Sequence, residues 1–258
     1  MLDNRRYYSL DALRGSMMML GIVLHGSQWY LTAPPAGIPM PLDSSSSYLF
    51  DVIMHFIHSF RMPLFMVLAG FFTSLLVGKR GFKGAIKNRV DRILMPLLLA
   101  CVTILPLTMV FMVSFMASAR FGTHQFLANA EQLQIIQGEM VAAGFPVNQP
   151  SLGHLWFLYY LMYFYLLIPV YFLLSRWSLK LNIRPIVTSP MFYVALGLYT
   201  SVTLWYFRGG VLFEGFIFIK PHLPSLIYYG SFFIFGYLFH NHRSILVTFS
   251  SHLKWFSA

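Results

Sequence analysis

The chain has 258 residues, of which 57% are hydrophobic and only 10% are charged. Soluble domains carry about a quarter of their residues as charged side chains, so the composition excludes an ordinary soluble protein. The formal net charge of +10 lies mostly between apolar runs, which favours membrane topology over nucleic-acid binding. The single cysteine, Cys101, excludes an intrachain disulfide and a cysteine metal cluster.

Apolar runs of membrane-spanning length recur along the chain, since a helix of about 20 residues crosses the hydrocarbon core. The sequence therefore predicts an all-α, polytopic transmembrane helix bundle in one domain, residues 1–258. The first run continues past Leu24 without a small-residue cleavage site, which indicates a retained anchor rather than a signal peptide. The six predicted spans are residues 10–31, 49–77, 93–118, 152–175, 191–207 and 223–240.

Lysine and arginine residues alternate between the two sides of these spans. Thirteen of the 18 lie before the first span, in the second and fourth connections, or after the sixth span. Three lie in the other connections, and the remaining two, Arg14 and Arg61, lie within spans. Because loops rich in Lys and Arg stay in the cytoplasm, both termini are predicted to be cytoplasmic.

Polar side chains occur at both ends of the first span. Arg14 and His25 are 11 residues apart, which places them on one face of a helix and about 16 Å apart along its axis. Asp11 precedes Arg14 by about one turn and is predicted to pair with it. Asp11 and Arg14 could simply be interfacial side chains at a helix start. An ionisable group as deep as His25 more often faces a cavity or a pathway.

The second span carries a stripe of polar residues. Asp51, His55 and His58 follow the i, i+4, i+7 spacing of one helix face, and Arg61 lies beside it. Pro63 is predicted to kink this helix about one turn before its own position.

The histidines of the first two spans are predicted to share one depth. His25 and His55 each lie about 9 Å inside the outer membrane face if the helices end near Leu31 and begin near Leu49. Polar groups at one level imply a cavity open to water or substrate. A neutral histidine there can take a proton from an acceptor hydroxyl. A metal site formed by the histidines and Asp51 is the less favoured alternative.

Two further places carry weaker signals. Arg89 and Arg92, three residues apart, share one face if the third helix extends to them, and two guanidiniums so placed suit a phosphorylated ligand. A cytoplasmic loop is commonly basic, however, and can contact anionic lipid. His154 follows Gly153 at the start of the fourth span and could be a loop residue without a role.

Four motifs in this order resemble the acyltransferase-3 family of membrane acyl-CoA transferases. The first span has the Arg-x10-His motif as Arg14 and His25, and the second contains "FIHSFRMPLFMVLAGFF". The basic connection has Arg-x-x-Arg as "RVDR", and the fourth span opens with "GHLWFL". The pattern is most similar to the glucan biosynthesis protein C branch, whose members resemble succinyltransferases of periplasmic glucans in Gram-negative bacteria.

The resemblance implies a multi-pass O-acyltransferase of the bacterial inner membrane. It would move an acyl group, with succinyl favoured, from cytoplasmic acyl-CoA to hydroxyls of a periplasmic glucan or another glycan. His25, as general base, and Arg14 would be catalytic, and Arg14, Arg89 and Arg92 would bind acyl-CoA. The resemblance implies no bound cofactor or metal ion. The residues expected to bind or support the acceptor or acyl group are Asp51, His55, His58, Arg61 and His154.

The resemblance also leaves alternatives. Family members usually have about ten spans, so a chain with six is expected to be truncated at its C-terminal end and could be inactive. A secondary transporter with a cavity lined by His, Asp and Arg is a further alternative, although such proteins commonly show repeated halves.

Overall fold

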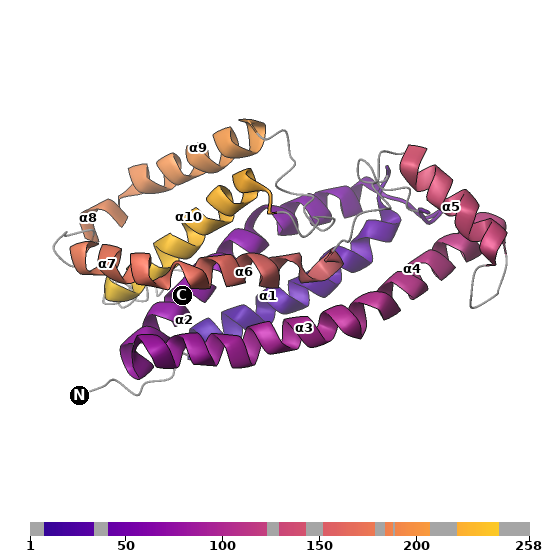
Figure 1. Cartoon of the computed structure of the whole chain (residues 1–258). Coiled ribbons are helices and arrows are strands. Elements are labelled where there is room, and N and C mark those ends of the chain that lie inside the picture. Colours follow the sequence, from indigo (N-terminus) through magenta and orange to yellow (C-terminus); the bar gives the residue numbers. More distant parts are fainter. Residues whose placement is uncertain are drawn as a thin grey trace.

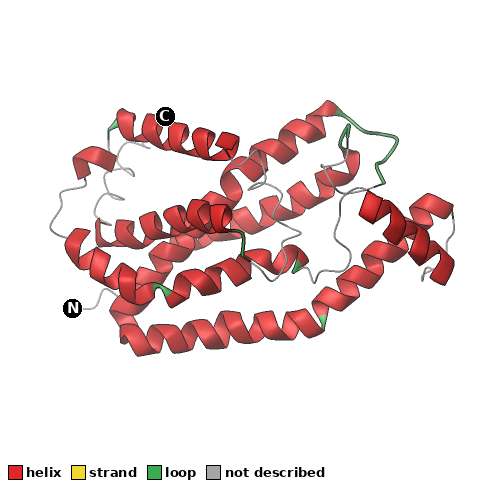
Figure 2. Ribbon diagram, turned by 45° about the horizontal axis from the view of Figure 1, so that its top comes forward, coloured by secondary structure: helices red, strands yellow, loops and turns green. Residues whose placement is uncertain are grey.

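The computed structural model describes residues 8–33, 41–122, 129–142, 152–178, 184–187, 189–206 and 221–242. These residues form helices and no strand, which confirms the all-α prediction for them (Figures 1 and 2). The longer helices are α1 (Tyr8–Ser27), α2 (Tyr48–Arg89), α3 (Met95–Val102), α4 (Ile104–Phe121), α5 (Ala130–Ala142), α6 (Trp156–Leu166), α7 (Ile168–Ser178), α9 (Pro190–Tyr206) and α10 (Leu223–Phe239). Shorter turns are η1 (Gln28–Tyr30), η2 (Val90–Leu94), η3 (Gly153–Leu155), α8 (Arg184–Val187) and η5 (His240–His242).

The marked break in α2 lies at Gly81, where φ is 68° and ψ is 178°. Glycine adopts a positive φ without the steric penalty of a β-carbon, so the chain can turn there. After this turn, α3 and α4 run back along the bundle (Figure 1). Pro63 was predicted to kink α2, but the helix continues through it with helical backbone angles. Prolines are tolerated inside membrane helices because neighbouring groups satisfy the freed carbonyl.

α2 and α10 meet backbone to backbone. A β-carbon on Gly70 would overlap the carbonyl oxygen of Phe233, and one on Gly236 would overlap the carbonyl oxygen of Val67. Small residues at a crossing let membrane helices approach closely. The glycine of the "LAGFF" stretch is therefore explained by this crossing.

Aromatic side chains fill the core between α2, α6, α7 and α10. The ring centres of Trp156 and Tyr229 are 5.3 Å apart, and those of Phe164 and Phe233 are 5.4 Å apart. Such pairs each add about 0.5–1.5 kcal/mol beyond the area they bury. The most deeply buried aromatic side chains are Tyr160, Tyr228, Tyr229, Phe233 and Tyr237.

α1 packs along α2 in the opposite direction. Leu24, near the end of α1, packs with Met54 and Ile57 near the beginning of α2. Arg14, near the beginning of α1, lies with its Cζ 5.1 Å from the ring centre of Phe72. The two ends of α1 therefore contact opposite ends of the apolar part of α2.

The helix directions alternate along the chain. α9 runs antiparallel to α10, since Phe192 contacts Phe235 and Tyr199 contacts Tyr228 (Figure 1). α4 runs opposite to α2 in the same figure. This is the arrangement that successive membrane crossings produce.

Length and composition identify fewer spans than the six predicted. Among the described residues two stretches qualify, Tyr48–Val102 and Ile104–Phe121, and a third qualifies if α6 and Ile168–Leu174, bent by 57°, form one span. All six predicted spans overlap helices, but α9 and α10 have only 17 residues each. The six-span count and the cytoplasmic termini stay predictions.

α5 is a helix that the sequence reading did not predict. Asn129 and Gln132 cap its beginning reciprocally, with each side-chain oxygen accepting from the other's backbone N–H at 2.9–3.0 Å. Its Ile136 and Met140 pack with Met116 of α4. The Asn-x-x-Gln spacing, a relative of the capping box, was the available signal.

Candidate functional site

Three guanidinium groups come together at the end of the bundle where α1 begins and α2 ends. Arg14 of α1 has its Nη1 3.8 Å from Asp11 Oδ1, which confirms the predicted pair. The charges of Arg14 and Arg92 both act on Arg89. These like charges converge from α1, α2 and η2, so the three arginines, here called the basic cluster, form an anion-attracting surface.

Arg89 is the most firmly held member of the basic cluster. Its Nη2 donates to Thr73 Oγ1 at 3.0 Å, and its Cζ lies 5.0 Å from the ring centre of Tyr165. Its Nε is buried without a hydrogen-bond partner in the part of the chain that the structure describes. A buried guanidinium nitrogen without a partner is costly unless a ligand satisfies it.

Arg92 differs from Arg89 in its surroundings. It is exposed and lies in the π-helical turn η2, whereas Arg89 is the last residue of α2. The helical stretch Tyr48–Val102 runs through both residues, so the condition of the prediction is met, and the shared face itself stays a prediction. The wider turn interrupts α-helical spacing, and π-helical turns occur frequently at functional sites.

His25 lies in the last turn of α1, half-buried, at the opposite end from Arg14. Its Nδ1 is 3.3 Å from Gln28 Oε1. An amide oxygen only accepts, so this contact places the ring proton on Nδ1 and the lone pair on Nε2. That tautomer leaves Nε2 as the basic atom of the ring.

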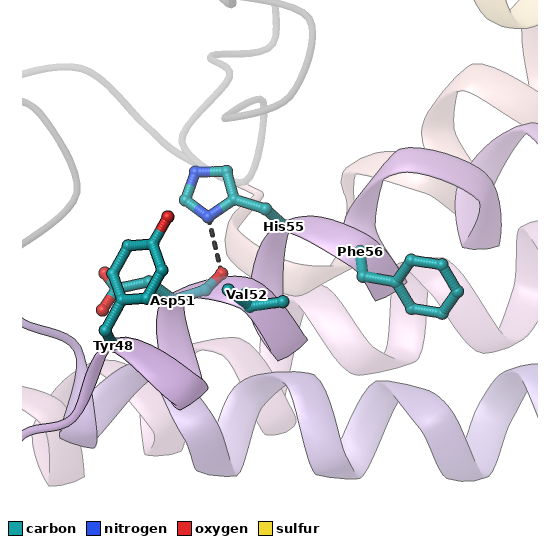
Figure 3. A pocket seen from close by; sticks show the side chains of 5 residues that line it. All are labelled: Tyr48, Asp51, Val52, His55 and Phe56. Carbon is teal, nitrogen blue, oxygen red and sulfur yellow. Dashed lines mark hydrogen bonds between the residues drawn. The ribbon is translucent and has the colours of Figure 1, made fainter.

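An open pocket of about 530 Å³ lies at the beginning of α2, lined by Tyr48, Asp51, Val52, His55 and Phe56 (Figure 3). His55 Nδ1 donates to the backbone oxygen of Asp51 at 2.8 Å, which leaves the lone pair on Nε2. The Asp51 carboxylate accepts from the Thr32 N–H at 3.2 Å. Figure 3 shows the Tyr48 and His55 rings on one side of the helix and the Phe56 ring pointing away from them.

Arg61 lies deeper in the bundle. Its Nη1 occupies the space that a β-carbon on Gly21 would need, so the guanidinium rests directly on α1. Tyr229 of α10 is close enough for its phenol to act on the guanidinium electrostatically. Its Nε is buried, and no carboxylate of the described residues forms an ion pair with it.

The structure brings some of the predicted site residues together and separates others. Leu24, beside His25, packs with Ile57, beside His58, so these two histidines lie on adjacent helices. His25 and His55, however, each bond within their own segment. Both ring nitrogens of His58 are buried, and the backbone of His154 lies in η3, with its side chain outside the described atoms. The described residues contain no group of three His, Cys, Asp or Glu side chains that could hold a metal ion.

Four polar residues near the basic cluster were missed by the sequence reading. Thr73 and Tyr165 contact Arg89. Ser74, which follows Thr73 in α2, has its Oγ 3.2 Å from Nδ1 of the buried His240. No pattern in the sequence connects these positions, because the contacts depend on the turn at Gly81 within α2 and on the packing of α2 against α6 and η5.

Apolar helices of membrane-spanning length, with the basic cluster at one end of the bundle, His25 and His55 at the other and Arg61 between them, are typical of a membrane protein with polar groups along its interior. The model of the acyltransferase-3 family, described as an acyltransferase domain, matches residues 7–258. The chain belongs to the acyltransferase-3 family.

Curated relatives match a shorter stretch. The chain is 36% identical over 97 residues to Glucans biosynthesis protein C of Escherichia coli K12, and 35% identical over 96 residues to the protein of that name from Salmonella paratyphi B. Each alignment covers 37% of this chain and 24% of the relative, so the chain matches about a quarter of the relatives' length. No solved structure matches the chain significantly.

Proposed function

We propose that the protein is a multi-pass O-acyltransferase of the bacterial inner membrane. It moves an acyl group, with succinyl favoured, from cytoplasmic acyl-CoA to hydroxyls of a periplasmic glucan or another glycan. Family membership supports the reaction class. The observation that carries the proposal is that Arg14 and His25 lie at opposite ends of one helix, about 16 Å apart by helical rise.

The basic cluster is the proposed donor site. Acyl-CoA carries several phosphates, and guanidinium groups bind phosphate through paired, charge-assisted hydrogen bonds. The charges of Arg14 and Arg92 repel that of Arg89, and a polyanion that binds there relieves the repulsion. The Nε of Arg89 has no partner among the described residues, so its hydrogen-bonding capacity is unused there.

His25 is the proposed general base. Its Nε2 takes the proton of the acceptor hydroxyl while the hydroxyl oxygen attacks the thioester carbonyl. The carbon–sulfur bond then breaks, CoA leaves as a thiolate, and the proton held on His25 passes to that sulfur. The products are an acyl ester and CoA, and the histidine returns to its starting state. Gln28, through its contact with Nδ1, keeps the ring in the reactive tautomer.

The open pocket at the beginning of α2 is the proposed acceptor site. Sugar hydroxyls donate to carboxylates and to imidazole lone pairs, and the pocket offers both in Asp51 and His55. The apolar faces of sugar rings suit the exposed ring of Tyr48. His154, at the start of the fourth predicted span, and His58 stay predicted as supporting residues.

Arg61 supports succinyl over acetyl as the acyl group. A half-buried guanidinium whose Nε is buried, and which has no acidic partner among the described residues, is stabilised by an anionic ligand. The distal carboxylate of a succinyl chain supplies that charge, and an acetyl group has none.

The deciding experiment measures acyl transfer in membranes that contain the protein, with labelled succinyl-CoA and a periplasmic glucan. His25→Ala is expected to lower the rate by roughly 10²–10⁴-fold, the usual contribution of a general base. Met19→Ala, which changes an exposed residue of the same helix, is the control and is expected to keep the wild-type rate. Full activity of His25→Ala contradicts the base assignment.

A second measurement identifies the product. Mass spectrometry of periplasmic glycans from cells with and without the intact gene gives the mass increment of the acyl group and the identity of its carrier. Movement of a labelled solute in the absence of acyl-CoA, with no change in glycan mass, would instead indicate a transporter.

A further inference from the structure

Thr73 occupies a central position beside the basic cluster. Its side chain is completely buried in α2, and its hydroxyl donates to the backbone oxygen of Ala69 at 2.7 Å. A threonine hydroxyl has one proton and two lone pairs, so with its proton committed to Ala69 it can only accept from other groups. One of those groups is Arg89, whose Nη2 is 3.0 Å away.

Tyr165 approaches the same guanidinium from α6. Its ring centre lies 5.0 Å from Arg89 Cζ, within the range of a cation–π contact, and the ring is almost fully buried. Its phenol also lies next to the Thr73 side chain. Two helices therefore fix the guanidinium together, one through a hydrogen bond and the other through a ring face.

This arrangement restricts Arg89 in a way that its neighbours lack. Arg89 follows the break at Gly81, so the backbone of α2 alone does not define its position relative to the bundle. A guanidinium has five N–H donors, and Thr73 takes one of them at Nη2. Of the four remaining donors, the one on Nε is buried without a partner among the described residues. Arg92, in contrast, is exposed and has no comparable cradle among the described residues.

We infer that Thr73 and Tyr165 are positioning residues that hold Arg89 in the orientation that binds the donor's phosphates. The inference rests on the proposed function, because it requires that Arg89 binds acyl-CoA. It assigns a role to two residues outside the four family-like motifs. The expected consequence is selective: loss of either contact weakens donor binding and leaves the chemical step at His25 unchanged.

The test uses the full chain in membranes or detergent, with kcat and KM measured for succinyl-CoA and with coenzyme A binding measured directly by calorimetry. Thr73→Val keeps the shape of the side chain but removes the hydroxyl. Thr73→Ser keeps the hydroxyl. Thr73→Val is expected to raise KM roughly tenfold with kcat nearly unchanged, because hydrogen bonds to charged groups are worth about that factor. Thr73→Ser is expected to stay within about twofold of the wild type.

The matched control is Ser74→Ala. Ser74 is the adjacent residue, is also buried, and bonds to His240 instead of Arg89. It is expected to change stability without raising KM for succinyl-CoA. Equal increases in KM for Thr73→Val and Ser74→Ala would overturn the inference, because both effects would then come from packing of α2.

Variants of Tyr165 provide a second, independent test of the positioning role. Tyr165→Phe keeps the ring face and is expected to raise KM less than Tyr165→Leu, which removes it. This ranking remains measurable even if Thr73→Val fails to fold. Equal KM values for the two Tyr165 variants contradict the role of the ring.

The Arg89→Ala variant distinguishes a failure of the proposed donor site from a failure of the positioning role. An unchanged KM and unchanged coenzyme A affinity would reject the donor site itself, and the positioning role with it. A raised KM in Arg89→Ala with an unchanged KM in Thr73→Val would reject only the positioning role.

Discussion

Arg61 of α2 rests on Gly21 of α1 so closely that its guanidinium fills the space a β-carbon at position 21 would require. No acidic residue occurs between positions 52 and 90 of the chain. The cation of Arg61 fits inside the bundle at this contact because Gly21 has no side chain.

Substitution at this contact should alter the choice of acyl donor. Arg61→Met is expected to lower kcat/KM for succinyl-CoA by roughly 10–100-fold, since a hydrogen bond between charged groups is lost. The value for acetyl-CoA should change much less. Gly21→Ala should act in the same direction because it displaces the guanidinium. Gly15→Ala, where a β-carbon meets no atom within 4 Å, is the control on the same helix. Equal losses with both donors would argue against recognition of a carboxylate.

The crossing of α2 and α10 should be sensitive to a single methyl group. Gly70→Ala and Gly236→Ala each place a β-carbon against a backbone carbonyl, which cannot move as a side chain can. Each is expected to destabilise the protein by about 1–3 kcal/mol. Gly78→Ala, in open space on α2, should be neutral or slightly stabilising. Thermal unfolding in detergent measures the difference, and a stable Gly70→Ala variant would show that the helices can separate at little cost.

The two arginines of the "RVDR" stretch should respond differently to salt. Arg92 is exposed, so its contribution to donor binding is screened as ionic strength rises, whereas the buried contacts of Arg89 are screened less. Arg92→Ala should therefore weaken coenzyme A binding at low salt and have little effect at high salt. Arg89→Ala should weaken it at both. Calorimetric titration at two salt concentrations distinguishes them, and identical salt dependence would contradict the assignment.

The pocket at the beginning of α2 should affect the acceptor and not the donor. Tyr48→Ala removes the exposed ring, and Asp51→Asn removes a charge that accepts sugar hydroxyls. Both are expected to raise KM for the glucan roughly tenfold and leave KM for acyl-CoA unchanged. Leu49→Ala changes an exposed neighbour that does not line the pocket and serves as the control. A change in the donor KM would place the pocket in a different role.

Hydropathy predicted where the helices lie because burial in lipid requires long apolar runs, and all six predicted spans overlap helices. The pairing of Asp11 with Arg14 was predictable because one helical turn separates them. The position of the break in α2 was not predictable from the sequence. Proline tends to kink helices in general, but the break lies at Gly81, where it depends on the packing of the surrounding structure. Nor was the contact of Thr73 with Arg89 predictable, because it depends on the turn between them. Sequence patterns report contacts within one element far better than contacts between elements.

The separation of Arg14 and His25 along α1 sets the distance that a bound donor has to span. A donor held at Arg14 has to carry its reactive carbonyl across about 16 Å to reach His25. A compact phosphate ester of the same acyl group can bind to the arginines, but its carbonyl stays at the wrong end of the helix. If the proposed donor site is correct, the length of the donor's flexible arm is expected to matter for recognition as much as its charge.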